Sequence, residues 1–130
     1  MNKKQIINTD KAPSPIGPYN QSILVNDMLF VSGQIPLDLQ TQEIIQDIEE
    51  ATHLVMSHLK NILAASHLTF EDVVKATIFL KSMDDFATVN AVYGQYFIEE
   101  TAPVRETVAV KELPKNAPIE ISLIALAKKG

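Results

Sequence analysis

The 130-residue sequence contains no cysteine and no tryptophan, and arginine occurs only once, at position 105. Because there is no thiol, the chain has no disulfide, thiolate zinc site, iron–sulfur cluster or cysteine nucleophile. No run of about 20 apolar residues is present that would cross a bilayer, and the basic N-terminus lacks the apolar stretch of a signal peptide. Any chemistry must therefore use oxygen and nitrogen groups, and we expect a cytoplasmic protein.

Basic clusters and phosphate-binding motifs are also missing. Sixteen acidic against eleven basic residues give a formal charge of −5, which repels a nucleic-acid backbone unless the cations gather on one face. The glycine patterns of P-loops, of dinucleotide-binding folds and of serine hydrolases do not occur. His53 and His58 do not face a common metal, because a helix turns about 140° between them, and His67 lies near a helix C-terminus. We therefore expect no metal centre and no nucleic-acid ligand.

The length corresponds to one ordinary domain, so we expect residues 1–130 to form a single domain. Apolar positions at steps of three and four predict a helix over residues 47–67, and a second helix is expected over residues 83–99 with Ser82 as its N-cap. Residues 26–27 lie between two β-prone runs and predict a hairpin turn, although neither is glycine. The predicted strands cover residues 22–25, 28–32, 73–80, 105–110 and 119–127.

This order of elements predicts an α+β domain in which two helices cover one face of a mixed sheet. The last strand is apolar on both faces, because Ile121 and Leu123 alternate with Ile124 and Leu126. Helices on one side of a sheet account for only one apolar face. We therefore expect a second subunit to cover the other face.

Two charged residues are candidates for chemistry. Glu120 lies among apolar strand neighbours, where burial would raise its pKa toward the range useful for proton transfer; the alternative is a strand-end carboxylate in water. Arg105 offers a planar donor fork that suits a substrate carboxylate, or it has a structural role. If the strands over residues 105–110 and 119–127 pair, both side chains would converge on one pocket, but the register stays open. We expect Tyr93 to belong to the core.

Six segments resemble the RidA (YjgF) family in order and spacing, and together they extend over essentially the whole chain. They are residues 16–19, 30–36, 72–80, 85–93, 103–105 and 113–121. The resemblance implies a chorismate-mutase-like α+β subunit in a homotrimer with clefts between subunits. It also implies 2-iminobutanoate/2-iminopropanoate deaminase activity, which hydrolyses 2-enamine and 2-imine acids such as 2-aminoacrylate to 2-oxo acids and ammonia. Neither a cofactor nor a metal is implied.

The resemblance also implies roles for individual residues. Arg105 would grip the substrate carboxylate, Glu120 would position and activate the attacking water, and Tyr19 would shape the pocket beside them. The other implied site residues, which bind substrate through side chain or backbone or support the site, are Ser32, Gly33, Thr107 and Asn90. The chain departs from the family at Thr107, where many relatives carry cysteine, and at Asn116, which replaces a common glycine at the rim.

Two other functions remain open. A non-catalytic trimer that senses small 2-oxo acids would use Arg105 equally well, whereas Glu120 favours catalysis because a second anion weakens simple binding of a carboxylate. A ribonuclease or translation inhibitor, a role attributed to some relatives, is disfavoured by the charge of −5 and by the lack of a basic stripe with interleaved aromatics.

Overall fold

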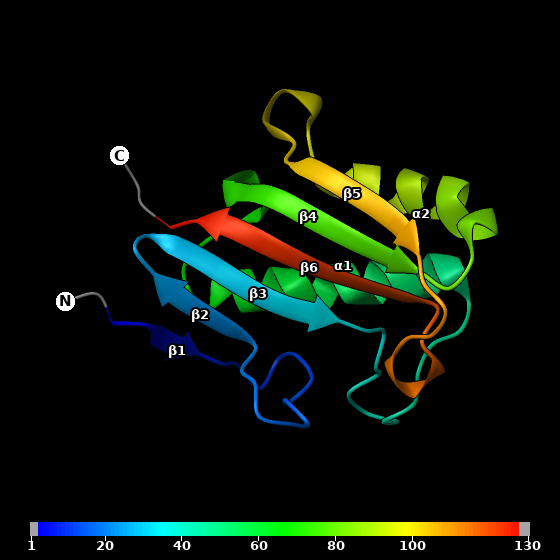
Figure 1. Ribbon diagram of the computed structural model, residues 1–130, viewed down its shortest axis with the longest axis horizontal. Coiled ribbons are helices and arrows are strands. Elements are labelled where there is room, and N and C mark those ends of the chain that lie inside the picture. Colours follow the sequence, from blue (N-terminus) through cyan, green and yellow to red (C-terminus); the bar gives the residue numbers. More distant parts are fainter. Residues whose placement is uncertain (1–2, 128–130) are drawn as a thin grey trace.

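The computed structural model describes residues 3–127 and consists of one six-stranded sheet with two α-helices (Figure 1). The ends of the predicted domain, residues 1–2 and 128–130, lie outside the described residues. The strands are β1 (Gln5–Ile7), β2 (Ser22–Val25), β3 (Met28–Gln34), β4 (Val73–Leu80), β5 (Val104–Ala109) and β6 (Ile119–Leu126), and the helices are α1 (Ile48–Ala64) and α2 (Phe86–Tyr93). The strand order is β1-β2-β3-β6-β4-β5, and only β4 and β5 run parallel.

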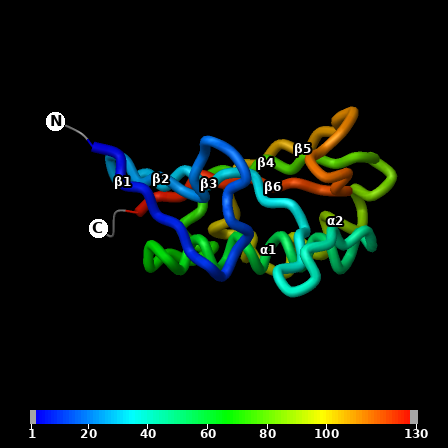
Figure 2. The backbone as a smooth tube through the Cα atoms, turned by 90° about the horizontal axis from the view of Figure 1, so that it is seen from below, coloured from blue at the N-terminus to red at the C-terminus, as the bar shows by residue number. Residues whose placement is uncertain are grey.

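Both helices lie on one side of the sheet (Figure 2), which confirms the predicted α+β architecture. Helix α1 begins where predicted, because the side chain of Asp47 accepts a hydrogen bond from the backbone N–H of Glu50. The predicted apolar stripe of α1 is buried against the sheet, and alternate residues of β4 and β6 point toward it. The largest fully buried apolar side chains of this core include Leu29, Met56, Leu59, Ile62, Ile78, Ile119 and Ile121.

The predicted hairpin between β2 and β3 is present, with Val25 paired to Met28. Asn26 and Asp27 take positive φ values of 50° and 64°, the conformation of a two-residue turn that asparagine and aspartate tolerate better than most residues. Strand β3 extends two residues beyond its predicted end. Strand β1 was not predicted, because three residues are too few to show a β-pattern in the sequence.

The prediction of the second helix, over residues 83–99, is wrong in its extent, because α2 covers only Phe86–Tyr93. Ser82 caps a short 3-10 turn by accepting from the N–H of Asp84, α2 follows, and the chain becomes extended at Phe97 with φ −131° and ψ 145°. In this conformation the ring of Phe97 lies 4.7 Å from that of Tyr93 and 5.3 Å from that of Phe70. The α-helix thus ends at Tyr93, a 3-10 turn over Gly94–Tyr96 follows, and the extended backbone at Phe97 lets its ring pack on Phe70 of a distant segment, although the apolar stripe continues in the sequence.

The sheet face away from the helices carries large apolar side chains that the described residues leave open. Phe30 pairs with Ile124 across β3 and β6 and is 44% exposed, and Val108 and Leu126 are each 43% exposed. Within residues 3–127, no helix is long and apolar enough to span a membrane.

Candidate functional site

Glu120 lies near the start of β6, on the sheet face away from the helices and opposite Phe79 of β4. The side chain is half-buried, and this burial raises the pKa of its carboxyl group above the ordinary value. It extends over Gly33 of β3: a Cβ atom at position 33 would lie 2.7 Å from Cδ and 2.9 Å from Cγ of Glu120. Glycine at position 33 thus leaves the space that the Glu120 side chain occupies.

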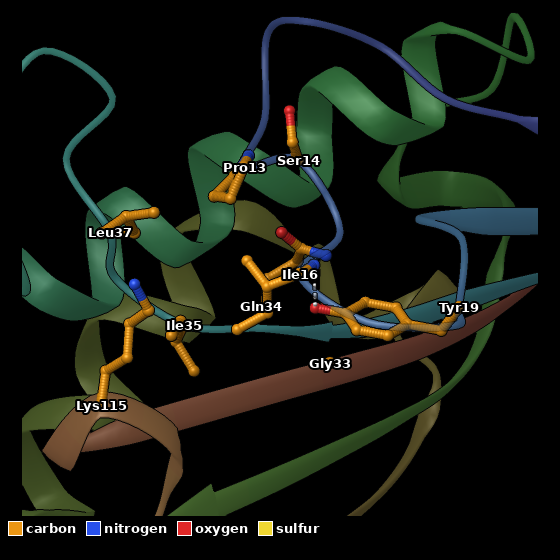
Figure 3. A pocket seen from close by; sticks show the side chains of 9 residues that line it. All are labelled: Pro13, Ser14, Ile16, Tyr19, Gly33, Gln34, Ile35, Leu37 and Lys115. Carbon is orange, nitrogen blue, oxygen red and sulfur yellow. Dashed lines mark hydrogen bonds between the residues drawn. The ribbon is translucent and has the colours of Figure 1, made fainter. Parts of the chain in front are cut away.

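A pocket of about 300 Å³ opens beside this carboxyl group. It is lined by Ile16, Tyr19, Gly33, Ile35, Pro114 and Glu120. Figure 3 shows a neighbouring pocket that shares four of these lining residues, Ile16, Tyr19, Gly33 and Ile35. There the Tyr19 ring extends toward Ile16, and its hydroxyl oxygen accepts a hydrogen bond from the backbone N–H of Ile16 at 3.3 Å. Tyr19 is 47% exposed, so its ring forms an open wall of the pocket.

Ser32 holds the loop that carries Tyr19. Its hydroxyl group donates to the backbone carbonyl of Asn20 at 2.6 Å, and its backbone N–H donates to the carbonyl of Gln21 at 2.9 Å. Gln21 is buried, and its side-chain amide donates to backbone carbonyls of the same loop. The sequence interpretation missed this role of Gln21, because a lone glutamine beside a proline-rich segment carries no distinctive pattern.

Arg105 lies on β5, one of the two edge strands of the sheet, and its side chain meets α2. Its Nη1 donates to Oδ1 of Asn90 at 2.8 Å, and its Cζ lies 5.0 Å from the ring centroid of Tyr93 and 5.8 Å from that of Phe86. The predicted core position of Tyr93 is confirmed, since this residue is 6% exposed. The sequence interpretation missed that Tyr93 and Phe86 also contact the arginine: the spacing of residues 86, 90 and 93 places them on one helix face, but it does not show which distant residue this face meets.

Thr107 lies two residues after Arg105 on the same face of β5. Its Oγ1 atom is buried and has no hydrogen-bond partner among the described residues. No hydrogen bond within the described residues therefore explains why a hydroxyl group stands at position 107.

Asn116 lies in the loop before β6, two residues after the pocket residue Pro114, with a φ of 57°, a conformation that favours glycine and that asparagine also adopts. Its backbone carbonyl accepts from the side-chain amide of Gln46 at 3.2 Å, and its Oδ1 accepts from Nζ of Lys81. The departure from the family glycine therefore adds a side-chain contact that ties this loop to Lys81, the residue after β4.

The structure does not bring Arg105 and Glu120 together within one chain. Strand β4 lies between β5 and β6, so the pairing that would have made the two side chains converge does not form. Arg105 is level with buried Ala76 on the helix side, whereas Glu120 is level with Phe79 on the other side. Two strand spacings and three residue steps separate their backbones by about 14 Å, and the side chains leave opposite faces of the sheet.

His53 and His58 have partners within the chain. Nδ1 of His53 lies 2.7 Å from the hydroxyl group of Tyr96, and Nε2 of His58 lies 2.8 Å from the carbonyl oxygen of Leu37. Among residues 3–127, no three histidine, cysteine, aspartate or glutamate side chains are grouped so that they would hold a metal ion.

A family model described as Endoribonuclease L-PSP matches residues 9–127. The chain belongs to this family, the RidA (YjgF) family. The resemblance read from the six sequence segments is thereby confirmed. A RutC family protein of Synechocystis sp. is 48% identical over 94% of this chain and 95% of its own length.

Solved structures of RidA family members have the same fold. A Thermotoga maritima protein described as an endoribonuclease candidate is 50% identical, with a TM-score of 0.91 over 97% of this chain and 98% of its own. Escherichia coli TdcF, named as a candidate reactive intermediate deaminase, is 43% identical over 95% of this chain and 97% of its own length. The crystal structure of TdcF with bound serine matches with a TM-score of 0.88 over 94% of this chain and 98% of that chain.

Proposed function

We propose that this protein hydrolyses 2-enamine and 2-imine acids, such as 2-aminoacrylate and 2-iminobutanoate, to 2-oxo acids and ammonia. The observation that carries the proposal is a half-buried carboxyl group with a raised pKa at a pocket, in a chain whose single guanidinium group is oriented by a helix. The similarity to TdcF supports it, because the name of that protein describes a reactive intermediate deaminase candidate and its crystal holds serine, a small molecule with an α-carboxylate.

The chemistry requires few groups. The guanidinium group of Arg105 binds the substrate carboxylate through two parallel charge-assisted hydrogen bonds. An enamine gains a proton at carbon and becomes the iminium ion, the nitrogen-protonated form of the imine, so C2 is electrophilic. Glu120 accepts a proton from water as the water oxygen bonds to C2, and that proton then passes to the amino nitrogen of the adduct. The C–N bond breaks, ammonia leaves, and the hydroxyl group on C2 gives its proton to the Glu120 carboxylate as the carbonyl forms, with Tyr19 as a wall of the pocket.

The two halves of this site come from different subunits in our proposal. The pocket with Glu120 and the Arg105 face cannot meet in one chain, because they lie on opposite faces of the sheet. In a closed ring of three chains, each contact joins two different surfaces, so the β5 edge of one chain would complete the Glu120 pocket of the next. The open apolar face around Phe30 and Val108 supports such an assembly, because burial of this surface would stabilise it.

Mixing two inactive variants tests this proposal. Arg105→Ala and Glu120→Ala should each abolish measurable hydrolysis of freshly generated 2-iminobutanoate, since each removes one half of every site. In oligomers assembled at random from equal amounts of both, about one quarter of the sites join an intact Glu120 to an intact Arg105, so about one quarter of the wild-type activity should return.

Isolation of the mixed oligomers through a different tag on each variant removes the pure rings and raises the expected activity to about one third of the wild type, because each mixed ring of three then holds one intact site. The control is the same procedure with each variant alone. Mixed oligomers without recovered activity would exclude a shared site. Wild-type rates of ammonia release from the Arg105→Ala variant alone would exclude the assignment of the carboxylate-binding residue.

The family model's name makes RNA cleavage the second candidate. The charge of −5 argues against it, because a phosphate backbone is bound mainly through cations. Incubation of the protein with single-stranded RNA distinguishes the two: cleavage that Glu120→Gln leaves intact, together with absent imine hydrolysis, would favour the nuclease. A non-catalytic sensor of 2-oxo acids would be favoured if wild type and Glu120→Gln bind a 2-oxo acid equally well and both hydrolyse imines equally slowly.

A further inference from the structure

One face of α2 contacts Arg105. Phe86, Asn90 and Tyr93 follow one another at intervals of four and three residues, so their side chains leave the helix in nearly the same direction. All three meet the same guanidinium group: Asn90 through a hydrogen bond of 2.8 Å, and the two rings at centroid distances of 5.8 Å and 5.0 Å. The first and the last residue of α2 thus contact the arginine as well as the one between them.

We infer that Phe86 and Tyr93 are positioning residues that fix the orientation of the Arg105 guanidinium group for its ligand. The hydrogen bond to Asn90 restrains one nitrogen, Nη1, but a single bond leaves the group free to rotate about it. Aromatic rings at about 5 to 6 Å attract a cation and restrict that rotation. The remaining N–H groups have no hydrogen bond within the described residues and stay available for a carboxylate.

The ring of Tyr93, and not its hydroxyl group, serves this role. The hydroxyl is buried and has no hydrogen-bond partner among the described residues. Burial raises the pKa of Tyr93 to about 12, so the ring stays uncharged at neutral pH. The ring also packs against that of Phe97 at 4.7 Å, a contact that Tyr93→Phe keeps, and attraction of a guanidinium group requires an aromatic ring.

The single arginine of the chain allows a direct test. Its 15Nε–1H resonance is unique in the spectrum of the protein, so its motion can be measured without substrate. We expect a rigid Nε–H group in the wild type and in Tyr93→Phe, with an order parameter near 0.8, and values below about 0.6 in Tyr93→Leu and Phe86→Leu. Tyr96→Leu is the matched control, because it removes a neighbouring ring that contacts His53 and not Arg105.

Ligand binding gives a second measurement. The inference rests on the proposed function in that Arg105 binds the carboxylate of the substrate, which the product 2-oxobutanoate also carries. The dissociation constant for 2-oxobutanoate should rise about fivefold in Tyr93→Leu and in Phe86→Leu and be restored in Tyr93→Phe. The same leucine substitutions should have no further effect in an Arg105→Ala background, because residues acting through one group are not additive.

The outcomes separate this inference from the proposed function. Equal order of the Nε–H group in the wild type and both leucine variants would overturn the inference, as would a mobile group in the wild type. Phe86 is 36% exposed, so Phe86→Leu decides the matter if Tyr93→Leu does not fold. If the wild type binds 2-oxobutanoate without hydrolysing imines, and the leucine variants loosen Arg105, the proposed function fails and the positioning role stands.

Discussion

Replacement of Gly33 by alanine tests the position of the Glu120 carboxyl group with a single methyl group. Carbon atoms in contact normally lie about 3.5 to 4.0 Å apart, whereas the new Cβ would lie 2.7 Å from Cδ and 2.9 Å from Cγ of Glu120. The carboxyl group must therefore move by about 1 Å. A displacement of this size at a reacting group costs about 100-fold in rate, so we expect kcat/KM for 2-iminobutanoate to fall about 100-fold, or about 2.7 kcal/mol.

The fold should tolerate this change. No described glycine has a positive φ, so alanine adopts the backbone conformation of Gly33 without strain. The loss of chain flexibility in the unfolded state favours alanine by about 0.4 to 1 kcal/mol, which offsets part of the cost of moving Glu120. The free energy of unfolding, measured with denaturant, should therefore change by no more than about 1 kcal/mol.

Gly94→Ala is the matched control, because a Cβ atom at position 94 meets no other atom within 4 Å. It should hydrolyse imines at the wild-type rate. Gly33→Ala combined with Glu120→Gln should be little slower than Glu120→Gln alone, because both act on the same group. Wild-type kcat/KM in a folded Gly33→Ala variant would refute the reasoning that the carboxyl group must keep its place over Gly33.

Three further predictions concern single groups. Thr107→Val should leave imine hydrolysis within about twofold of the wild type and keep stability or raise it by about 1 kcal/mol, because it removes a buried hydroxyl group without a partner among the described residues; lost hydrolysis in the folded variant would show that this hydroxyl contacts the substrate. Burial raises the pKa of Glu120 from 4.5, so kcat/KM should fall as the pH falls through that raised value, and the acidic limb of the pH profile should lie above pH 4.5; a limb at or below 4.5 would contradict its role as the base. Burial lowers the pKa of His58 in the folded protein from 6.5, so His58 of the unfolded chain takes up a proton at higher pH than His58 of the folded chain. The free energy of unfolding that neutral His58 contributes is present above pH 6.5 and is lost as the pH falls from 6.5 through the pKa of folded His58. Denaturant unfolding should therefore show that the free energy of unfolding falls less below pH 6.5 in His58→Gln than in the wild type. The opposite contribution of Glu120 is the same in both proteins and cancels in the comparison. Equal decreases in the free energy of unfolding would contradict this prediction.

Local patterns in the sequence correctly predicted the elements whose cause is local. The stripe and the Asp47 cap of α1 depend on residues within a few positions of one another, and so does the turn at Asn26 and Asp27. The two-sided apolar pattern of β6 correctly indicated a face that the helices do not cover. Residue chemistry singled out Arg105 and Glu120, and family motifs added the other candidate site residues, but neither specifies where these residues lie in space.

The tertiary structure alone decided how the candidate residues are placed. Strand order and register depend on contacts between distant segments, and no local pattern shows that β4 separates β5 from β6. For this reason Arg105 and Glu120 fall on opposite faces instead of in one pocket. The end of α2 and the space over Gly33 have the same origin, since Phe97 and Glu120 reach their partners only in the folded chain. The single arginine, at first only a scarce residue, therefore forms half of a site shared between subunits only in our proposal, because one chain does not bring it to Glu120.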